Sequence, residues 1–178
     1  MSGRHADDET VQAALLAEEK AHVLDQLVAT DPGLAASATR VARTRLCEVV
    51  VDDVAAAVAD GLLALDQEDL AARAGPTRYG YVEPTEAAWQ LLEEALEPWL
   101  QDIARRAALG LFDASADVAC GIVLALRSID GCDSDERLLS WAPDFAAEAT
   151  ESVRRALSDV GIGAGDPRLE RISGRTAS

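Results

Sequence analysis

The sequence predicts an all-α protein, an antiparallel helical bundle or a short helical-repeat array of about six to seven helices. Three observations predict this class. Leu and Ala together far outnumber Val and Ile, which favours helix over sheet. Apolar residues recur at helical spacing through most of the chain. Short segments rich in Gly and Pro separate these periodic stretches, as the connections of a bundle do.

The predicted domain organisation is simple. A chain of 178 residues, of which 49% are hydrophobic, is long enough to bury a core. We expect residues 1–8 to be a frayed polar N-terminus and residues 9–160 to form one all-α domain. Residues 161–178 have little to bury and are predicted to be a mobile tail.

The first two predicted helices cover residues 9–30 and 34–47, and the breaker Asp31-Pro32-Gly33 separates them. Helical spacing predicts that the following apolar residues face inward: Ala13, Leu16, Val23, Leu24 and Leu27 in the first helix, and Leu34, Ala38, Val41 and Leu46 in the second. Lys20 lies within the first stripe. A buried lysine can act as a base or nucleophile, but we expect its stem to pack at the core edge with the ammonium in water.

The next predicted helices cover residues 50–65 and 67–74, and the second of these ends at Gly75-Pro76. The longer one has the inward stripe Val51, Val54, Val58, Leu62 and Leu65. Residues 75–84, with the sequence GPTRYGYVEP, form the longest stretch without helical periodicity inside the domain. We expect this segment to be an irregular surface loop.

The clearest stripe of the chain predicts a helix over residues 85–109, with Trp89, Leu92, Leu96, Trp99, Leu100, Ile103 and Ala107 facing inward. Pro98 predicts a bend in it, because its ring removes one helical hydrogen bond. The helix over 113–128 is apolar nearly all round, which predicts a central position, with Gly121 allowing close approach of a neighbour. A last helix covers 143–160, with Phe145, Ala149, Val153 and Leu157 facing inward.

Charge excludes several classes of function. Acidic residues number 32 and basic residues 16, so the net charge is −16. Lys20 is the only lysine and the arginines are scattered, which argues against binding nucleic acid or an anionic membrane. Three widely spaced cysteines indicate reduced thiols, and neither a signal peptide nor a membrane span is expected. We therefore expect a cytoplasmic protein.

No candidate metal or catalytic pattern is complete. Glu19 and His22 form one E-x-x-H pair, but a di-iron site needs a second pair. The loop 130–136 carries Asp130, Asp133, Asp135 and Glu136, without the ligand alternation of an EF-hand, so we expect it to cap a helix. No Ser/His/Asp or Cys/His set is present. The sequence therefore predicts no catalytic residue, no cofactor and no metal.

Five of the seven aromatic residues draw attention to this part of the chain. Tyr79 and Tyr81 lie in the segment 75–84, Trp89 and Trp99 lie in the predicted helix that follows, and Trp141 comes later. Arg and Tyr are residue types that anchor protein interfaces. The sequence therefore predicts that Arg78, Tyr79 and Tyr81 contact a protein partner. The alternative is that both tyrosines turn inward and pack the segment against the bundle.

Two stretches carry a family resemblance. They are Val23-Leu-Asp-Gln-Leu-Val-Ala-Thr-Asp-Pro-Gly-Leu34, and the helix end Ser128-Ile-Asp-Gly-Cys-Asp-Ser-Asp135. Each resembles the helical region that follows the zinc finger in bacterial SWIM-type zinc-finger proteins. The zinc-ligand pattern of the finger is absent, so nucleic-acid binding is not implied. The resemblance implies a helical scaffold for protein contact.

These observations predict a non-catalytic helical scaffold that acts as a protein-interaction or regulatory module. A protein partner is expected, and a homo-oligomer is compatible with the sequence. The alternative is a helical protein that binds a small ligand or a metal in a pocket between helices, close to the third, fifth and sixth predicted helices. That alternative requires a closed polar cavity with converging carboxylates.

Overall fold

The computed structural model describes residues 13–78, 80–130, 138–163 and 166–168. Seven α-helices account for most of these residues, and two three-residue strands form the only sheet among them. The predicted all-α class is confirmed. Contacts between residues divide the chain into two units, 1–45 and 46–178, each of which is described by itself.

The smaller unit contains helix α2 (Ala17–Thr30) and most of helix α3 (Pro32–Cys47). Asp31 is the single residue between them. Its Oδ1 accepts the backbone N–H groups of Gly33 at 2.7 Å and Leu34 at 3.3 Å. These bonds satisfy donors that the first turn of α3 leaves without an intrahelical partner. The predicted break at Asp31-Pro32-Gly33 is therefore Asp31 alone, because Pro32 and Gly33 belong to α3.

The apolar residues of α2 and α3 do not face a core, contrary to the prediction. No described residue from 13 to 45 is buried. Leu16 is 61% exposed and Val41 is 62% exposed. Lys20 is also exposed, so the burial that a catalytic lysine needs is absent. Periodicity correctly identified the apolar side of each helix, but it contains no information on what covers that side.

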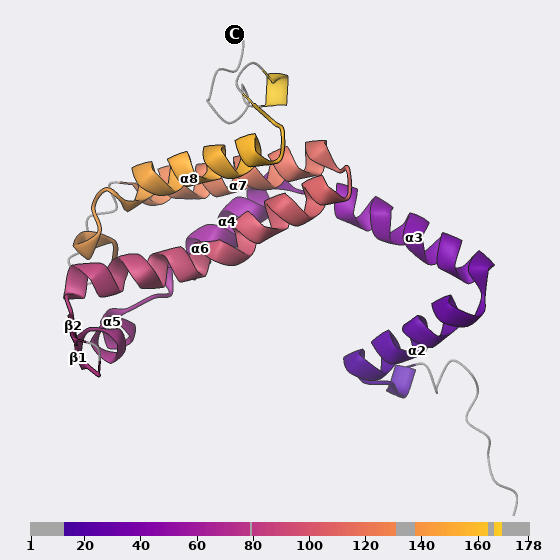
Figure 1. The fold of residues 1–178 in the computed structure, drawn as a ribbon, viewed down its shortest axis with the longest axis horizontal. Coiled ribbons are helices and arrows are strands. Elements are labelled where there is room, and N and C mark those ends of the chain that lie inside the picture. The colour runs from indigo at the N-terminus through magenta and orange to yellow at the C-terminus, as the bar shows by residue number, and fades with distance from the viewer. Residues whose placement is uncertain (1–12, 79, 131–137, 164–165, 169–178) are drawn as a thin grey trace, which may run out of the picture. The chain divides into compact units, whose positions relative to one another are not determined.

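The larger unit is a bundle of four long helices, shown side by side in Figure 1. They are α4 (Val51–Leu63), α6 (Pro84–Ala108), α7 (Phe112–Ile129) and α8 (Phe145–Asp159). The short helix α5 (Gln67–Arg73), the strands β1 (Gly75–Thr77) and β2 (Gly80–Val82) and the 3-10 helix η1 (Leu138–Trp141) complete the unit.

Helix α7 is the centre of this bundle. It packs against α4, α6 and α8, and eleven of its 18 residues are buried. A helix with a wide apolar surface needs several neighbours, and α7 has three, although Leu124 remains exposed. The predicted central position of residues 113–128 is confirmed. Its Ser115 is fully buried, and the Ser115 hydroxyl donates a 2.9 Å hydrogen bond to the Ile103 carbonyl of α6.

At Gly121, α7 approaches α4 closely. A Cβ atom added at Gly121 would lie 2.6 Å from the Cβ of Val54 and 2.8 Å from the carbonyl oxygen of Val51. Both distances are shorter than a van der Waals contact, and one of the atoms belongs to the backbone. The predicted close approach at Gly121 is confirmed, and it depends on the absence of a side chain.

Gly121→Ala is expected to lower the free energy of unfolding by about 1–3 kcal/mol, because the added methyl forces α4 and α7 apart. Urea unfolding followed by circular dichroism measures the change. Gly61→Ala is the matched control, because Gly61 lies within α4 with open space where a Cβ would be. The control is expected to be neutral or stabilising by up to about 1 kcal/mol. Equal effects of the two substitutions would contradict the packing argument.

The segment predicted to be an irregular loop is a β-hairpin. Strands β1 and β2 pair antiparallel with the register Gly75↔Val82, Pro76↔Tyr81 and Thr77↔Gly80. Gly75 and Gly80 have φ angles of +113° and +145°, which L side chains rarely adopt. Gly80 adjoins the connection between the strands, whereas Gly75 begins β1 at the open end of the hairpin, opposite Val82. The hairpin is too short for periodicity to reveal it.

Helix α6 is unbroken through Pro98, which is exposed. Of its predicted inward residues, Leu92, Leu96, Ile103 and Ala107 are buried, and Trp89, Trp99 and Leu100 are half-buried against the core. Pro84 occupies the first turn, and Gly110, with φ +75°, follows the last. The predicted helix is confirmed, and the bend at Pro98 stays a prediction.

The start of the predicted mobile tail is docked instead. Gly161, with φ +87°, ends α8, and the Ile162 N–H donates to the Leu157 carbonyl at 2.9 Å. This is the Schellman arrangement, in which an apolar residue just past the glycine packs back on the helix. Ile162 is accordingly buried in the core. Arg168 then lies 5.7 Å from the centre of the Phe112 ring at the start of α7.

A candidate binding groove between α6 and α8

A groove lies along the contact between α6 and α8 in the larger unit. Both helices contribute side chains to its lining, and its cavity volume is about 200 Å³. Nine residues line it: Trp89, Glu93, Leu96, Glu97 and Leu100 from α6, and Phe145, Glu148, Ala149 and Ser152 from α8. We call this the α6–α8 groove. Its lining includes neither histidine nor cysteine.

The floor of the groove is apolar. The Trp89 ring meets the Phe145 ring edge-on, with centroids 5.4 Å apart and an interplanar angle of 65°. Phe145 and Leu96 belong to the core, whereas Trp89 is half-buried and keeps part of its ring at the surface. Edge-to-face pairs are a favoured aromatic geometry. The ring of Trp89 is therefore held in place for contact with a bound group.

Three carboxylates form the rim. Glu93 and Glu97 are one helical turn apart on α6, and Glu148 stands on α8. The Glu97 carboxylate accepts a 2.9 Å hydrogen bond from Gln101, which leaves its charge in place. Glu93 and Glu148 make no side-chain hydrogen bond or ion pair with any residue that the structure describes. Like charges one turn apart repel, so the groove carries an uncompensated negative potential.

Other acidic residues of α6 are neutralised within the fold. Arg73 of α5 binds Glu94 in a fork, with N–O distances of 2.7 and 2.6 Å. These hydrogen bonds hold the pKa of the Glu94 carboxyl below its ordinary value. This exposed ion pair joins α5 to α6, and Glu94 directly follows Glu93 in the sequence. The contrast separates carboxylates with an internal partner from those that face the groove.

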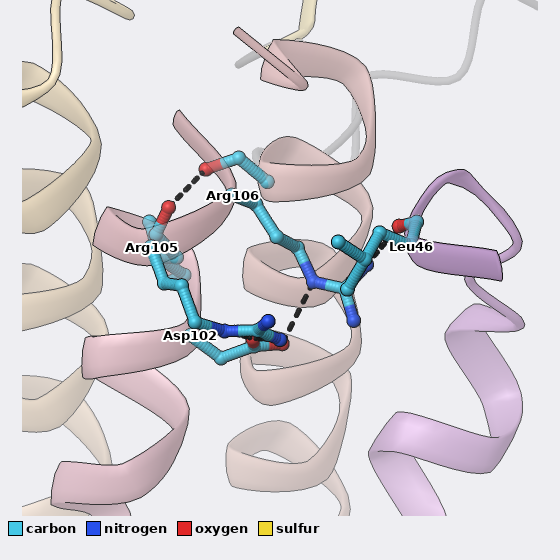
Figure 2. Close-up of polar contacts among 6 residues, drawn as sticks. Leu46, Asp102, Arg105 and Arg106 are labelled. Atoms are coloured by element: carbon cyan, nitrogen blue, oxygen red, sulfur yellow. Dashed lines mark hydrogen bonds and ion pairs between the residues drawn. The ribbon is translucent and has the colours of Figure 1, made fainter. Parts of the chain in front are cut away.

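A second paired site anchors the C-terminal end of α6 (Figure 2). Asp102 accepts hydrogen bonds from the Nε atoms of Arg105 at 2.9 Å and Arg106 at 2.7 Å. The Arg106 guanidinium also donates to the backbone carbonyl of Leu46, at the first residue of the larger unit. Asp102 thus orients Arg106, and Arg106 holds the chain that leads into α4.

The Asp102 carboxyl has a perturbed pKa with two opposing causes. Burial opposes ionisation and acts to raise the pKa, but the hydrogen bonds from Arg106 and Arg105 outweigh it. The pKa of Asp102 therefore lies below its ordinary value. A carboxylate that accepts charge-assisted hydrogen bonds is stabilised in its charged form. The charged form is the one that holds Arg106 in place.

Asp102→Asn is expected to lower the melting temperature near neutral pH. The folded pKa is depressed, so the charged carboxylate stabilises the fold above the unfolded Asp pKa of about 3.9. That contribution is lost as the pH falls through the lower, folded pKa. The difference in Tm between the wild-type protein and the variant should therefore shrink below about pH 4. Thermal unfolding from about pH 7 to pH 3 measures it, with the exposed Asp60→Asn as control. A difference that stays constant over this range would contradict the linkage.

The structure places two of the three predicted partner-binding residues, Arg78 and Tyr81, on the hairpin. Tyr81 on β2 is 61% exposed and pairs with Pro76 across the two strands. Arg78, at the turn, is exposed. Tyr79 lies outside the described residues. The exposure of Tyr81 argues against the alternative in which it packs into the core, and partner binding by Arg78, Tyr79 and Tyr81 stays a prediction.

The candidate metal and catalytic residues do not converge. No group of three or more His, Cys, Asp or Glu side chains in the described part of the chain is placed to hold a metal ion. Glu19 instead accepts the Leu16 N–H at 2.8 Å, and His22 lies 3.0 Å from the Gln26 amide. Asp130 is exposed after the end of α7, and the rest of the acidic loop, residues 131–136, lies outside the described residues.

The groove itself was missed at the sequence level. Glu93 and Glu97 belong to the charged side of the α6 pattern, which predicts only a solvated surface. Glu148 lies more than 50 positions away and carries no signal that links it to them. The available hint was a Trp at position 89 followed by two glutamates at helical spacing, Glu93 and Glu97.

Comparisons with known proteins found no match, so the function is inferred from the fold and the groove. No protein-family model, no curated protein and no solved structure matches the chain. The resemblance to SWIM-type proteins therefore stays a prediction. Among the residues that the structure describes, no helix combines the length and the apolar character needed to cross a membrane.

Proposed function

We propose that this protein is a non-catalytic protein-interaction module, and that the α6–α8 groove binds a basic amphipathic segment of a partner protein. The observation that carries the proposal is the combination of an apolar floor with three rim carboxylates, two of which have no partner among the described residues. A helix or extended segment with apolar and cationic side chains satisfies both features at once.

The chemistry of the floor and rim favours a cationic group. An Arg or Lys side chain can lie over the exposed part of the Trp89 ring, where a cation–π contact is favourable, and still reach Glu93 or Glu148. Ion pairs formed with carboxylates already near an apolar surface are screened less than those in open water. The net charge of −16 adds long-range attraction for a basic partner.

The cavity is less suited to the alternative function, binding of a small ligand or metal. Pockets for drug-sized molecules commonly measure about 300–1,000 Å³, and the groove measures about 200 Å³. Its carboxylates stand on the rim of two helices, and no metal-binding cluster is found in the described chain. Such a volume and rim fit single side chains of a bound protein segment.

The groove is tested with a labelled synthetic amphipathic peptide of Leu, Ala and Lys, and with the same peptide carrying Glu in place of Lys. The Lys peptide is expected to bind, and the Glu peptide is not. The triple variant E93Q/E97Q/E148Q should raise the Kd for the Lys peptide about tenfold, because three ion pairs of about 0.5 kcal/mol each are lost. Fluorescence anisotropy at low and high salt measures the Kd.

A matched control removes the same number of charges elsewhere. The variant D53N/D60N/E68Q alters three exposed acidic residues of α4 and α5 outside the groove. It is expected to change the Kd for the Lys peptide by less than about twofold. Equal weakening by both triple variants would show that net charge alone attracts the peptide, and no weakening by E93Q/E97Q/E148Q would exclude the groove.

The hairpin is tested separately as a second contact. Tyr81→Ala is expected to leave the free energy of unfolding within about 0.5 kcal/mol of the wild-type value, because Tyr81 is exposed. The double variant with Tyr79→Ala is measured beside it. The same variants should reduce the amount of a protein partner that co-purifies from the native cell. A loss of stability above about 2 kcal/mol, as for a buried aromatic residue, would contradict the surface role.

A further inference from the structure

The chain that follows α8 is held at the end of the larger unit where α7 begins. Ile162, just past the end of α8, is buried in the core. The guanidinium carbon of Arg168 lies 5.7 Å from the centre of the Phe112 ring, and one guanidinium nitrogen lies 3.7 Å from a carboxylate oxygen of Asp113. Asp166 accepts a 2.8 Å hydrogen bond from the same guanidinium. These contacts fix the point from which the following residues start.

Ten residues follow Arg168, with the sequence LERISGRTAS. We call them the 169–178 segment, and they lie outside the described residues. The segment combines two large apolar side chains and two arginines with a single acidic residue: Leu169, Ile172, Arg171, Arg175 and Glu170. It is therefore net positive in a chain whose net charge is −16. Apolar and cationic side chains together are the chemistry that the α6–α8 groove favours.

The groove lies within reach of this segment. Helices α6 and α8 end at the same side of the bundle, next to the start of α7 (Figure 1). The near end of the groove, at Leu100 and Ser152, lies about two helical turns before these helix ends, or about 12 Å. The far end, at Trp89, lies about 28 Å from the end of α6. Ten extended residues span at most about 35 Å, which covers the whole groove.

The charges and the apolar surfaces of the two sides are complementary. Glu93 and Glu148 have no side-chain partner among the described residues, and the lining of the groove includes no basic residue. The two arginines of the segment supply cations for this rim, and its apolar side chains can cover the exposed part of the Trp89 ring. Because the segment is tied to the fold at Arg168, its effective concentration at the groove is in the millimolar range.

We propose that the 169–178 segment occupies the α6–α8 groove of its own chain and competes there with the basic segment of a partner. This inference rests on the proposed function of the groove, and it adds a form of regulation. A partner binds only the fraction of molecules in which the groove is free, so its apparent affinity is lowered by that fraction.

Occupancy is tested with a labelled synthetic peptide of residues 169–178 and the full-length variant R171Q/R175Q, whose own segment has lost its cations. The peptide is expected to bind this variant with a Kd below about 1 mM, because only then does a millimolar effective concentration keep the groove occupied. The wild-type chain should bind the peptide at least about threefold more weakly. Fluorescence anisotropy measures both constants. A weaker Kd for the variant, or equal binding by the two chains, would overturn the proposal.

The site of binding is tested by further substitutions in R171Q/R175Q. Adding E93Q/E97Q/E148Q should raise the Kd for the 169–178 peptide about fivefold, as expected for the loss of two ion pairs. Adding D53N/D60N/E68Q, which removes three acidic groups outside the groove, is expected to change it by less than about twofold. Equal weakening by both sets would overturn the proposal, because net charge alone would then attract the peptide.

Competition is tested with the Lys peptide. R171Q/R175Q should bind it at least about threefold more tightly than the wild-type chain, at every protein concentration, because occupancy within one chain does not depend on concentration. R40Q/R43Q is the matched control, because it removes two exposed arginines of α3, and no change is expected. A gain in affinity from R40Q/R43Q in place of R171Q/R175Q would assign the groove to α3 and overturn the proposal. A difference that grows with protein concentration would assign it to the segment of a neighbouring molecule and overturn it as well.

The two peptides together separate this inference from the proposed function. Equal, measurable binding of the Lys peptide by the wild-type chain and by R171Q/R175Q would overturn the inference and leave the proposed function standing. Binding of the 169–178 peptide as expected, with no binding of the Lys peptide by either chain, would exclude the proposed function and support occupancy of the groove by the chain's own segment.

Discussion

The close contact of α7 with α4 at Gly121 is the constraint on which the larger unit depends. With no side chain at this position, the Val51 carbonyl and the Val54 side chain come within reach of the α7 backbone. Other faces of α7 pack against α6 and α8. The one fully buried polar side chain described, Ser115, has its hydroxyl satisfied by the Ile103 carbonyl of α6, so the centre of the bundle carries no unpaired hydroxyl donor there.

The acidic residues of α6 described above fall into two groups. Glu94 and Asp102 are paired with arginines, and these pairs attach α5 and the chain before α4 to the bundle. Glu93 and Glu97 point into the α6–α8 groove, where no basic residue lines the wall. The paired carboxylates stabilise the fold through their arginines. The unpaired carboxylates beside the apolar floor repel one another, and a bound cationic partner would relieve that repulsion.

The two units therefore offer surfaces of different physical kinds. The larger unit has a buried core, and its described surface includes a small groove with charge at its rim. In the smaller unit no described residue is buried, and what remains is an extended apolar surface on two short helices. The first suits a partner held by a few oriented contacts, and the second suits a surface that folds fully only when it is covered.

The sequence by itself determined the helices of this protein, because helical periodicity and breakers are local properties. The buried positions of α6, α7 and α8 and the close approach at Gly121 followed from that pattern. It could not determine the hairpin at Gly75–Val82, where three-residue strands are too short to show a period. The exposure of the α2 and α3 stripes, the docking of Ile162 and the meeting of Glu148 with Glu93 were decided by the tertiary structure alone, because each depends on which distant element lies opposite.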